Sequence, residues 1–380
     1  MRAAGDPRTS RYDAENSRLE FTEKGKPAGV LNVVNLFGEY LRIAKAERAT
    51  WLKKNCVGLL NRMEVPEDFE DAKPDLLPTI RPRAMLDVLR LDQEIAGSTE
   101  PTELAALPLS EHLVVCLAYD LPNTMQLVNN KALRQWGASA YEAGEIARHN
   151  LEARPFNLIR TTSNLYVFEC GDAYDSSRML MLDKVRDLEF QGKTIAIPIT
   201  RNCLMVTGSE ELDGLGQMAE QAESMKEDPR PLCSIPHMLD GDEWHAWQPP
   251  ADHPHYAKFR TLELRCLFGE YAEQKQQLEK LHEKTGLDVF VATFSVIDKS
   301  GRLLSWCVWS KGIVSWLPKT DFVGLYDPDV KAHRFARWDR MIEVASSLMK
   351  PLDLYPPRWA VDDFPSEEQF GQMAVEDWSK

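Results

Sequence analysis

Residues 171–182, GDAYDSSRMLML, bring carboxylates, hydroxyls and a guanidinium together within a few positions. They follow the apolar run LYVFEC and open a stretch with helical spacing, the position that a strand-to-helix nucleophile elbow gives its serine. A second polar turn, TRN, lies between two apolar runs, and turns of a rigid sheet are common places for catalytic groups. Arg201 and Asn202 could also bind an anion or serve only as turn residues. The candidate hydrolytic groups are Asp172, Asp175, Ser177, Arg178 and Arg201.

The glycines of a nucleophile elbow are missing from this stretch. The pattern G-x-S-x-G needs small residues around the serine, whereas Asp175 and Arg178 flank the two serines here. Asp175 or Ser176 can instead accept a hydrogen bond from an amide in the first turn of the helix, a cap worth about 1 kcal/mol. We therefore expect a helix cap and keep a hydrolytic site as the alternative.

Histidines gather between residues 237 and 255, with acidic residues beside them in the sequence. A zinc site needs three or four ligands that converge, with further acceptors that orient the imidazoles. The spacing matches no familiar zinc motif, and HPH lies in a proline-rich linker. We therefore expect packing or solvent roles, and we predict no metal and no cofactor. The weak candidates for metal ligands are His245, His253 and His255.

The last chemical feature is the aromatic content of the C-terminal region. Alternation along LLSWCVWS places Trp306 and Trp309 on opposite faces of a strand, so one of them could be exposed. An exposed tryptophan suits a protein interface, although a buried core explains the same residues. The interface candidates are Trp306, Trp309 and Trp316.

The elements that must position these residues are mostly hairpins. Five pairs of apolar runs, each interrupted by a short polar turn, predict β-hairpins, and segments with helical spacing follow three of them. The sequence therefore predicts an α+β fold of iterated hairpin and helix units, with antiparallel sheets and helices on one face. The turns are DLPN, TTSN, TRN, DGD and KSG, and the helical segments are 132–151 (broken at Gly137), 177–188 and 210–225.

Outside the hairpins, periodicity predicts further helices. Apolar residues recur at three- and four-residue steps over 33–60, which predicts a long N-terminal amphipathic helix or two helices broken near residue 49. Prolines leave room only for a short helix, 83–95, within 65–109. Helices are also expected over 259–282 and 331–349.

Composition divides the chain into four expected parts, with the main boundary at the proline-rich stretch QPPADHPHYAKF. They are a polar segment (1–29), a helical and proline-rich region (30–110), an α+β domain (111–250), and a C-terminal α+β module with an acidic tail (251–380).

The chain has 380 residues and a formal net charge of -14, which argues against broad binding to nucleic acid or anionic membranes. Its charge is uneven, because 30–62 is basic and 64–75 is acidic. The seven cysteines include no CxxC pair and mostly lie in apolar runs, as buried, reduced cysteines do. No apolar run approaches the roughly 20 residues of a membrane span. We expect a cytoplasmic protein.

Several motifs resemble the bacterial YtpQ family, a domain of unknown function. They are LAYDLPNTMQLVNNKALRQWGASAYEAGEIARHNL, GDAYDSSRML, IAIPITRNCLMVTG and LGQM, in that order. The resemblance covers about residues 19–247 and implies no established activity. The C-terminal extension lies outside it.

These observations favour a non-enzymatic protein-interaction or adaptor protein that binds another protein. The first alternative is a hydrolase with a polar site near residues 172–178 and 201. The second is an acidic immunity-type protein that neutralises a basic toxin, with affinity that depends strongly on salt.

Overall fold

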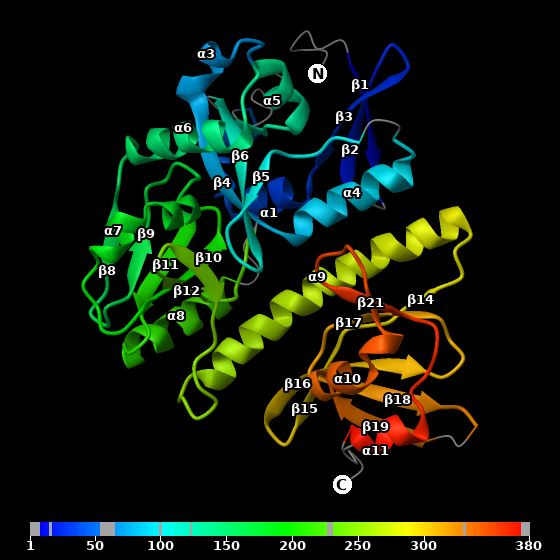
Figure 1. The fold of residues 1–380 in the computed structure, drawn as a ribbon. Coiled ribbons are helices and arrows are strands. Elements are labelled where there is room, and N and C mark those ends of the chain that lie inside the picture. The colour runs from blue at the N-terminus through cyan, green and yellow to red at the C-terminus, as the bar shows by residue number, and fades with distance from the viewer. Residues whose placement is uncertain are drawn as a thin grey trace.

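The computed structural model describes residues 8–14, 17–53, 65–98, 101–121, 124–225, 231–329 and 332–373. Strands in these ranges form five sheets, and helices pack against and between them (Figure 1). Most neighbouring strands are antiparallel, which confirms a mixed helix and sheet protein with antiparallel sheets. No helix in the described ranges is both long and apolar enough to cross a membrane.

The chain begins with strands, so the prediction of a long N-terminal helix was wrong. Strands β1 (Thr9–Asp13), β2 (Arg18–Glu23) and β3 (Lys26–Asn32) form an antiparallel sheet, and only then does α1 (Val34–Arg42) follow. Helix α1 ends because Ile43 is extended and Arg48 folds back, donating to the carbonyl oxygens of Leu41 (2.9 Å) and Ile43 (3.0 Å). Residues 48–53 are helical again, so the described residues fit the alternative of two helices, with the break at 43–47; residues 54–60 of that prediction lie outside the described ranges.

The second sheet joins two parts that composition separated. Strand β6 (Leu113–Leu121) pairs with β4 (Leu76–Pro82), β5 (Ala106–Pro108) and β7 (Thr124–Leu127). The prolines of this sheet lie in β4 and β5, the outer strands, where proline is tolerated because only one side of the strand pairs. The sheet therefore crosses the expected boundary at residue 110. The helices in this part of the chain are α3 (Phe69–Ala72), η2 (Lys73–Asp75), α4 (Ala84–Ala96), α5 (Asn130–Trp136) and α6 (Ala140–Glu152).

The break predicted between α5 and α6 is confirmed. Gly137 ends α5 with a left-handed φ of 66°, a conformation that glycine adopts without a steric penalty. Ser139 then caps α6 by accepting a hydrogen bond from the Glu142 amide.

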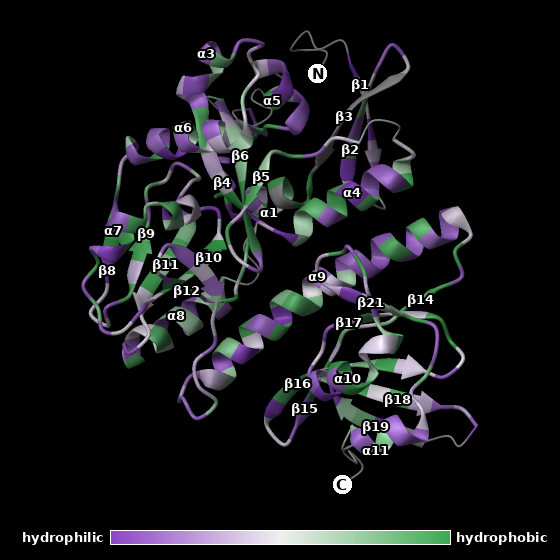
Figure 2. Ribbon diagram, in the orientation of Figure 1, coloured by the Kyte–Doolittle hydropathy of each residue, from purple (hydrophilic) through white to green (hydrophobic). Residues whose placement is uncertain are grey.

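The third sheet has six antiparallel strands in the order β13-β12-β10-β11-β9-β8, and it contains three of the predicted hairpins. Helix α8 packs on one face and η3 on the other, so both faces are covered, whereas the sequence predicted helices on one face. The reason is that the residues of TIAIPIT and CLMVTG are all buried, so these strands need cover on both faces. Figure 2 shows hydrophobic residues along β10 and β11. The elements are β8 (Leu158–Arg160), β9 (Tyr166–Phe168), η3 (Ser176–Leu180), α7 (Leu182–Arg186), β10 (Thr194–Thr200), β11 (Cys203–Gly208), α8 (Leu212–Ser224), β12 (His237–Asp240) and β13 (Glu243–Ala246).

Helix α9 (Tyr256–Thr285) runs between the N-terminal sheets and the C-terminal module (Figure 1). Its first residues pack on the six-stranded sheet, and Lys284 near its end donates to the carbonyls of Glu94 and Ile95 at the end of α4. The predicted helix 259–282 is thus confirmed, and it links the two sides of the expected domain boundary.

The C-terminal module contains two four-stranded sheets, each with one parallel strand pair. The predicted helix 331–349 was wrong over its first residues, because Ala332–Arg337 forms β19 beside β18. There the Phe335 ring packs 5.9 Å from that of Trp306, a contact across the sheet that the apolar spacing does not encode. The elements are β14 (Phe290–Val291), β15 (Ser295–Lys299), β16 (Arg302–Ser310), β17 (Ser315–Pro318), β18 (Phe322–Asp327), α10 (Trp338–Ala345), η4 (Ser346–Leu348), β20 (Lys350–Pro351), β21 (Arg358–Val361) and α11 (Glu367–Gln372).

Candidate functional sites

The polar stretch 171–178 is packed into the protein and forms a brace, meaning that its ion pair and hydrogen bonds tie it to neighbouring segments. Arg178 is fully buried and donates to both carboxylate oxygens of Asp172, at 3.0 and 2.9 Å, and to the carbonyl of Pro155 at 2.7 Å. Burial alone would raise the pKa of Asp172, but the hydrogen bonds from Arg178 and from the Tyr174 amide outweigh it and lower the pKa. The pair therefore stays ionised and ties the loop to the segment before β8.

The candidate nucleophile and acid of this stretch have structural partners. Ser177 is 1% exposed, and its Oγ accepts from the Ile80 amide at 3.4 Å. Asp175 accepts from the Cys170 amide at 2.7 Å, and burial raises its pKa. The expected cap was wrong, because Asp175 already has helical backbone angles and makes no side-chain bond to the first turn of η3, and Ser176 Oγ donates instead to the Arg201 carbonyl at 3.4 Å.

Arg201 lies beside this brace. The Ser176 amide donates to the Arg201 carbonyl at 3.2 Å, so the β10–β11 turn and the start of η3 meet. The guanidinium groups of Arg201 and Arg81 each donate to Met125 Sδ at 3.4 Å, and Arg201 Nε is buried without a hydrogen-bond partner. Arg81 also donates to Thr79 Oγ1 at 2.6 Å and to the Ile80 carbonyl at 2.9 Å, so it is held by protein acceptors. Asn123, in the neighbouring turn DLPN, lies outside the described residues.

The candidate metal ligands do not converge. His245 lies 3.5 Å from carboxylate oxygens of Glu111 and Glu243, whereas the His255 ring contacts the Leu212 carbonyl at 3.1 Å. His253 Nδ1 accepts the amide of His255. Over the described ranges, no group of three or more histidine, cysteine, aspartate or glutamate side chains is placed to hold a metal ion.

The three candidate interface tryptophans are buried or half-buried. Trp309 is fully buried and donates to the Asp363 carbonyl at 3.1 Å. Trp306 is half-buried on the other face of β16, 5.9 Å from the Phe335 ring, and Trp316 packs 4.6 Å from the His282 ring. Their main role in this structure is packing.

An exposed apolar groove lies instead on the N-terminal sheet and α1. It has a volume of about 520 Å³, and Tyr12 and Phe37 on its wall are 56% and 58% exposed. Aromatic rings form its floor, where Tyr40 lies 6.2 Å from both Phe37 and Trp51. The sequence prediction assigned this segment to a helix and did not identify the groove. The lining residues are Tyr12, Ser17, Val33, Val34, Leu36, Phe37, Tyr40, Trp51 and Leu52.

A second cluster, also missed, joins residues far apart in the chain. Tyr355 Oη lies 2.5 Å from His112 Nδ1, and the His112 ring lies 6.2 Å from that of His237. Burial lowers the pKa of His112 to about 4 and that of His237 to about 3, so both rings are neutral at pH 7. Burial also raises the pKa of Tyr355, so the phenol is protonated at pH 7 and shares a hydrogen bond with His112 Nδ1. Both ring nitrogens of His237 are buried without a hydrogen-bond partner.

No family model, curated protein or solved structure matches this chain. The resemblance to the YtpQ family therefore stays a prediction.

Proposed function

We propose that this protein is a non-enzymatic interaction protein that binds an amphipathic helix of another protein in the N-terminal groove. The observation that carries the proposal is the contiguous exposed apolar lining of the groove. Large apolar patches on a folded surface commonly mark interaction sites, and a helix lays its apolar face into such a groove. Leu52 in the lining is 39% exposed, and Leu41 at the end of α1 is 53% exposed.

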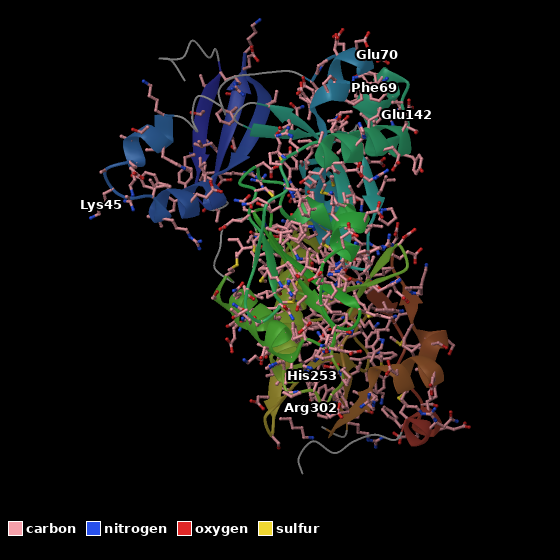
Figure 3. The ribbon with its side chains drawn as sticks, turned by 90° about the vertical axis from the view of Figure 1, so that its left-hand side faces the viewer. Lys45, Phe69, Glu70, Glu142, His253 and Arg302 are labelled. Atoms are coloured by element: carbon pink, nitrogen blue, oxygen red, sulfur yellow. The ribbon has the colours of Figure 1, made fainter. Side chains whose placement is uncertain are left out.

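Charge around the groove favours an acidic partner. Lys45 and Lys53 are exposed, and neither forms an ion pair within the described part of the chain. The acidic stretch does not neutralise them, because Glu70 pairs locally with Lys73 and lies on the opposite side of the N-terminal half from Lys45 (Figure 3). An amphipathic helix with acidic flanks therefore matches both the lining and the rim.

The alternatives have less support. The hydroxyl of Ser177 is buried against a backbone amide, which disfavours the hydrolase. The negative net charge of the chain would attract a basic toxin, but the positive lysines at this groove would repel it.

Fluorescence anisotropy with the full chain tests the proposal. The probe is a labelled 18-residue peptide with leucines at helical spacing and glutamates on the opposite face. We expect binding that weakens with salt, and at least tenfold weaker binding to Phe37→Ser. Ile159→Ser is the matched control, since Ile159 is 49% exposed elsewhere.

Three results would overturn the proposal. They are equal binding by Phe37→Ser, equal binding of a scrambled peptide of the same composition, and binding only to vesicles that contain anionic lipid. The remaining possible occupant of the groove is a second copy of the chain. Sedimentation of the free protein would detect this as a dimer, and Phe37→Ser would dissociate that dimer.

A further inference from the structure

The β10–β11 turn brings an arginine to the place where the second and third sheets meet. Ser176, at the start of η3, donates from its amide and from its Oγ to the Arg201 carbonyl, at 3.2 and 3.4 Å. The η3 segment contacts β10 and β11 of the third sheet and β4 of the second sheet. The Arg201 side chain reaches Met125 in β7, a strand of the second sheet. The guanidinium of Arg201 therefore lies between the two sheets.

Arg201 has few partners for its hydrogen-bond donors. Its Nη1 donates to Met125 Sδ at 3.4 Å, and a thioether is a weak acceptor. Its Nε is buried without a hydrogen-bond partner, and no carboxylate in the described part of the chain forms an ion pair with it. Folded proteins give nearly every buried donor a partner, because an unpaired donor costs free energy. Arg201 is only partly buried, so the missing partner can come from solvent.

A second guanidinium lies close to the first. Arg81 is 9% exposed and also donates to Met125 Sδ at 3.4 Å. Because both guanidinium groups reach the same sulfur, they are at most two hydrogen-bond lengths apart. Thr79 Oγ1 and the Ile80 carbonyl hold Arg81 in place, but these two acceptors and the sulfur carry no charge. The two like charges repel in a partly buried space, where water screens them poorly, and an anion beside both would offset the repulsion.

Asp120 does not supply this anion, although it lies directly opposite Met125 in the β6–β7 hairpin. Its two carboxylate oxygens accept hydrogen bonds from Arg154 at 2.7 Å and from the Tyr174 hydroxyl at 3.0 Å. The charge of Asp120 is thus balanced by Arg154 in an ion pair. The charge of Arg201 has no counter-charge in contact with it among the described residues.

We propose that Arg201 and Arg81 bind the phosphate group of a small molecule between the second and third sheets. The Nε and Nη2 atoms of Arg201 donate to two phosphate oxygens, the two-point geometry that guanidinium groups form with oxyanions. Arg81, fixed by its own acceptors, supplies the second positive charge. A phosphate monoester carries about 1.5 to 2 negative charges at pH 7, so it matches two guanidinium groups better than a carboxylate does. No residue of this site lines the N-terminal groove, so the site does not depend on the proposed function.

Isothermal titration calorimetry of the full chain with inorganic phosphate, at constant ionic strength, tests the site. We expect one binding site per chain and at least tenfold weaker binding by Arg201→Gln. Arg201→Lys keeps the charge but loses the two-point edge, so it should bind more weakly than wild type and more tightly than Arg201→Gln. Arg160→Gln is the matched control and should bind as wild type does, because Arg160 is an exposed arginine of the third sheet that pairs with Glu189.

Thermal unfolding separates phosphate binding from a purely structural role of Arg201. Without phosphate, Arg201→Gln should melt no lower than wild type, because the substitution removes one of two adjacent cations. Phosphate should raise the melting temperature of the wild type, since it binds the folded state, and should leave that of Arg201→Gln unchanged. A melting temperature of Arg201→Gln that lies below wild type by the same amount with and without phosphate would overturn the proposal.

A comparison of ligands identifies the source of the phosphate group. Tighter binding of glycerol 3-phosphate than of inorganic phosphate would show that the site takes a phosphate ester, and equal binding would show that it takes the free ion. The proposal would be wrong if acetate bound as tightly as phosphate, if phosphate neither released heat nor shifted the melting temperature, or if Arg201→Gln bound phosphate as wild type does.

Discussion

Asp172 and Arg178 form a two-point ion pair in which the guanidinium is fully shielded from solvent. Asp172→Asn would remove the two-point partner of this buried cation and leave only the Asp175 carboxylate, 3.6 Å away, so we expect the free energy of unfolding to fall by about 3–5 kcal/mol. Chemical denaturation followed by circular dichroism measures the loss. Glu189→Gln is the control, because it removes the exposed partner of Arg160 and should cost less than about 1 kcal/mol. A loss as small as that of the control would show that the pair is no brace.

The neutral histidines predict a dependence of stability on pH. His112 and His237 have folded-state pKa values of about 4 and about 3, below the ordinary 6.5, so below pH 6.5 the unfolded chain binds more protons. Stability should be unaffected by these groups above pH 6.5 and should fall between pH 6.5 and about 3. The slope from each histidine approaches about 1.4 kcal/mol per pH unit.

The variant His237→Leu separates this effect from other acid titrations. It removes one neutral histidine, and the charged or titratable groups that face the pair, Glu111, Arg83 and Lys319, remain. We expect a shallower fall of the denaturation midpoint between pH 6 and 4 than in wild type. Parallel curves for the two proteins would show that His237 does not contribute.

Arg358 anchors the C-terminal module to α9. It donates to Gln274 Oε1 at 2.6 Å and to the Ala292 carbonyl at 2.8 Å, and burial lowers its pKa to about 10. Arg358→Met would leave these acceptors unpaired, and each buried acceptor costs about 1–3 kcal/mol. We expect a lower melting temperature with faster hydrogen exchange in β21 and β17. Arg302→Met, at an exposed strand end, should leave both measurements unchanged.

Two glycines give opposite expectations on replacement by alanine. A Cβ at Gly208 would overlap the carbonyl oxygen of Gln191, a backbone atom, so Gly208→Ala should destabilise the protein by about 1–3 kcal/mol. A Cβ at Gly269 within α9 meets nothing within 4 Å, so Gly269→Ala should stabilise it by about 0.5–1 kcal/mol. Thermal unfolding of both variants gives the comparison, and shifts of the same sign would contradict it.

Local patterns predicted the hairpins and the middle helices well, because strand and helix periods depend on neighbouring residues. The turn after α5 followed from Gly137, and the hairpins followed from apolar runs around short polar turns. The prediction of a long N-terminal helix was wrong because α1 ends where Arg48 folds back onto the carbonyls of Leu41 and Ile43. No apolar period encodes this arrangement.

The candidate sites were less predictable than the elements. The polar stretch 171–178 was identified, but only packing shows that Ser177 and Arg178 are buried against backbone and carboxylate partners. Nothing in the sequence associates His112 with Tyr355, which is 243 positions away. The groove was missed for a related reason, since exposure of Phe37 depends on which neighbouring elements leave it uncovered.

The sequence by itself determined the residue types, the acidic net charge, and most of the helices and strands, since these depend on composition and on interactions along a short stretch of chain. Tertiary structure decided which side chains meet and which stay in water. It brought His112 to Tyr355 and buried a suspected catalytic stretch, whose Arg178 pairs with Asp172. Such contacts join residues far apart in the chain, so they arise only when whole elements pack.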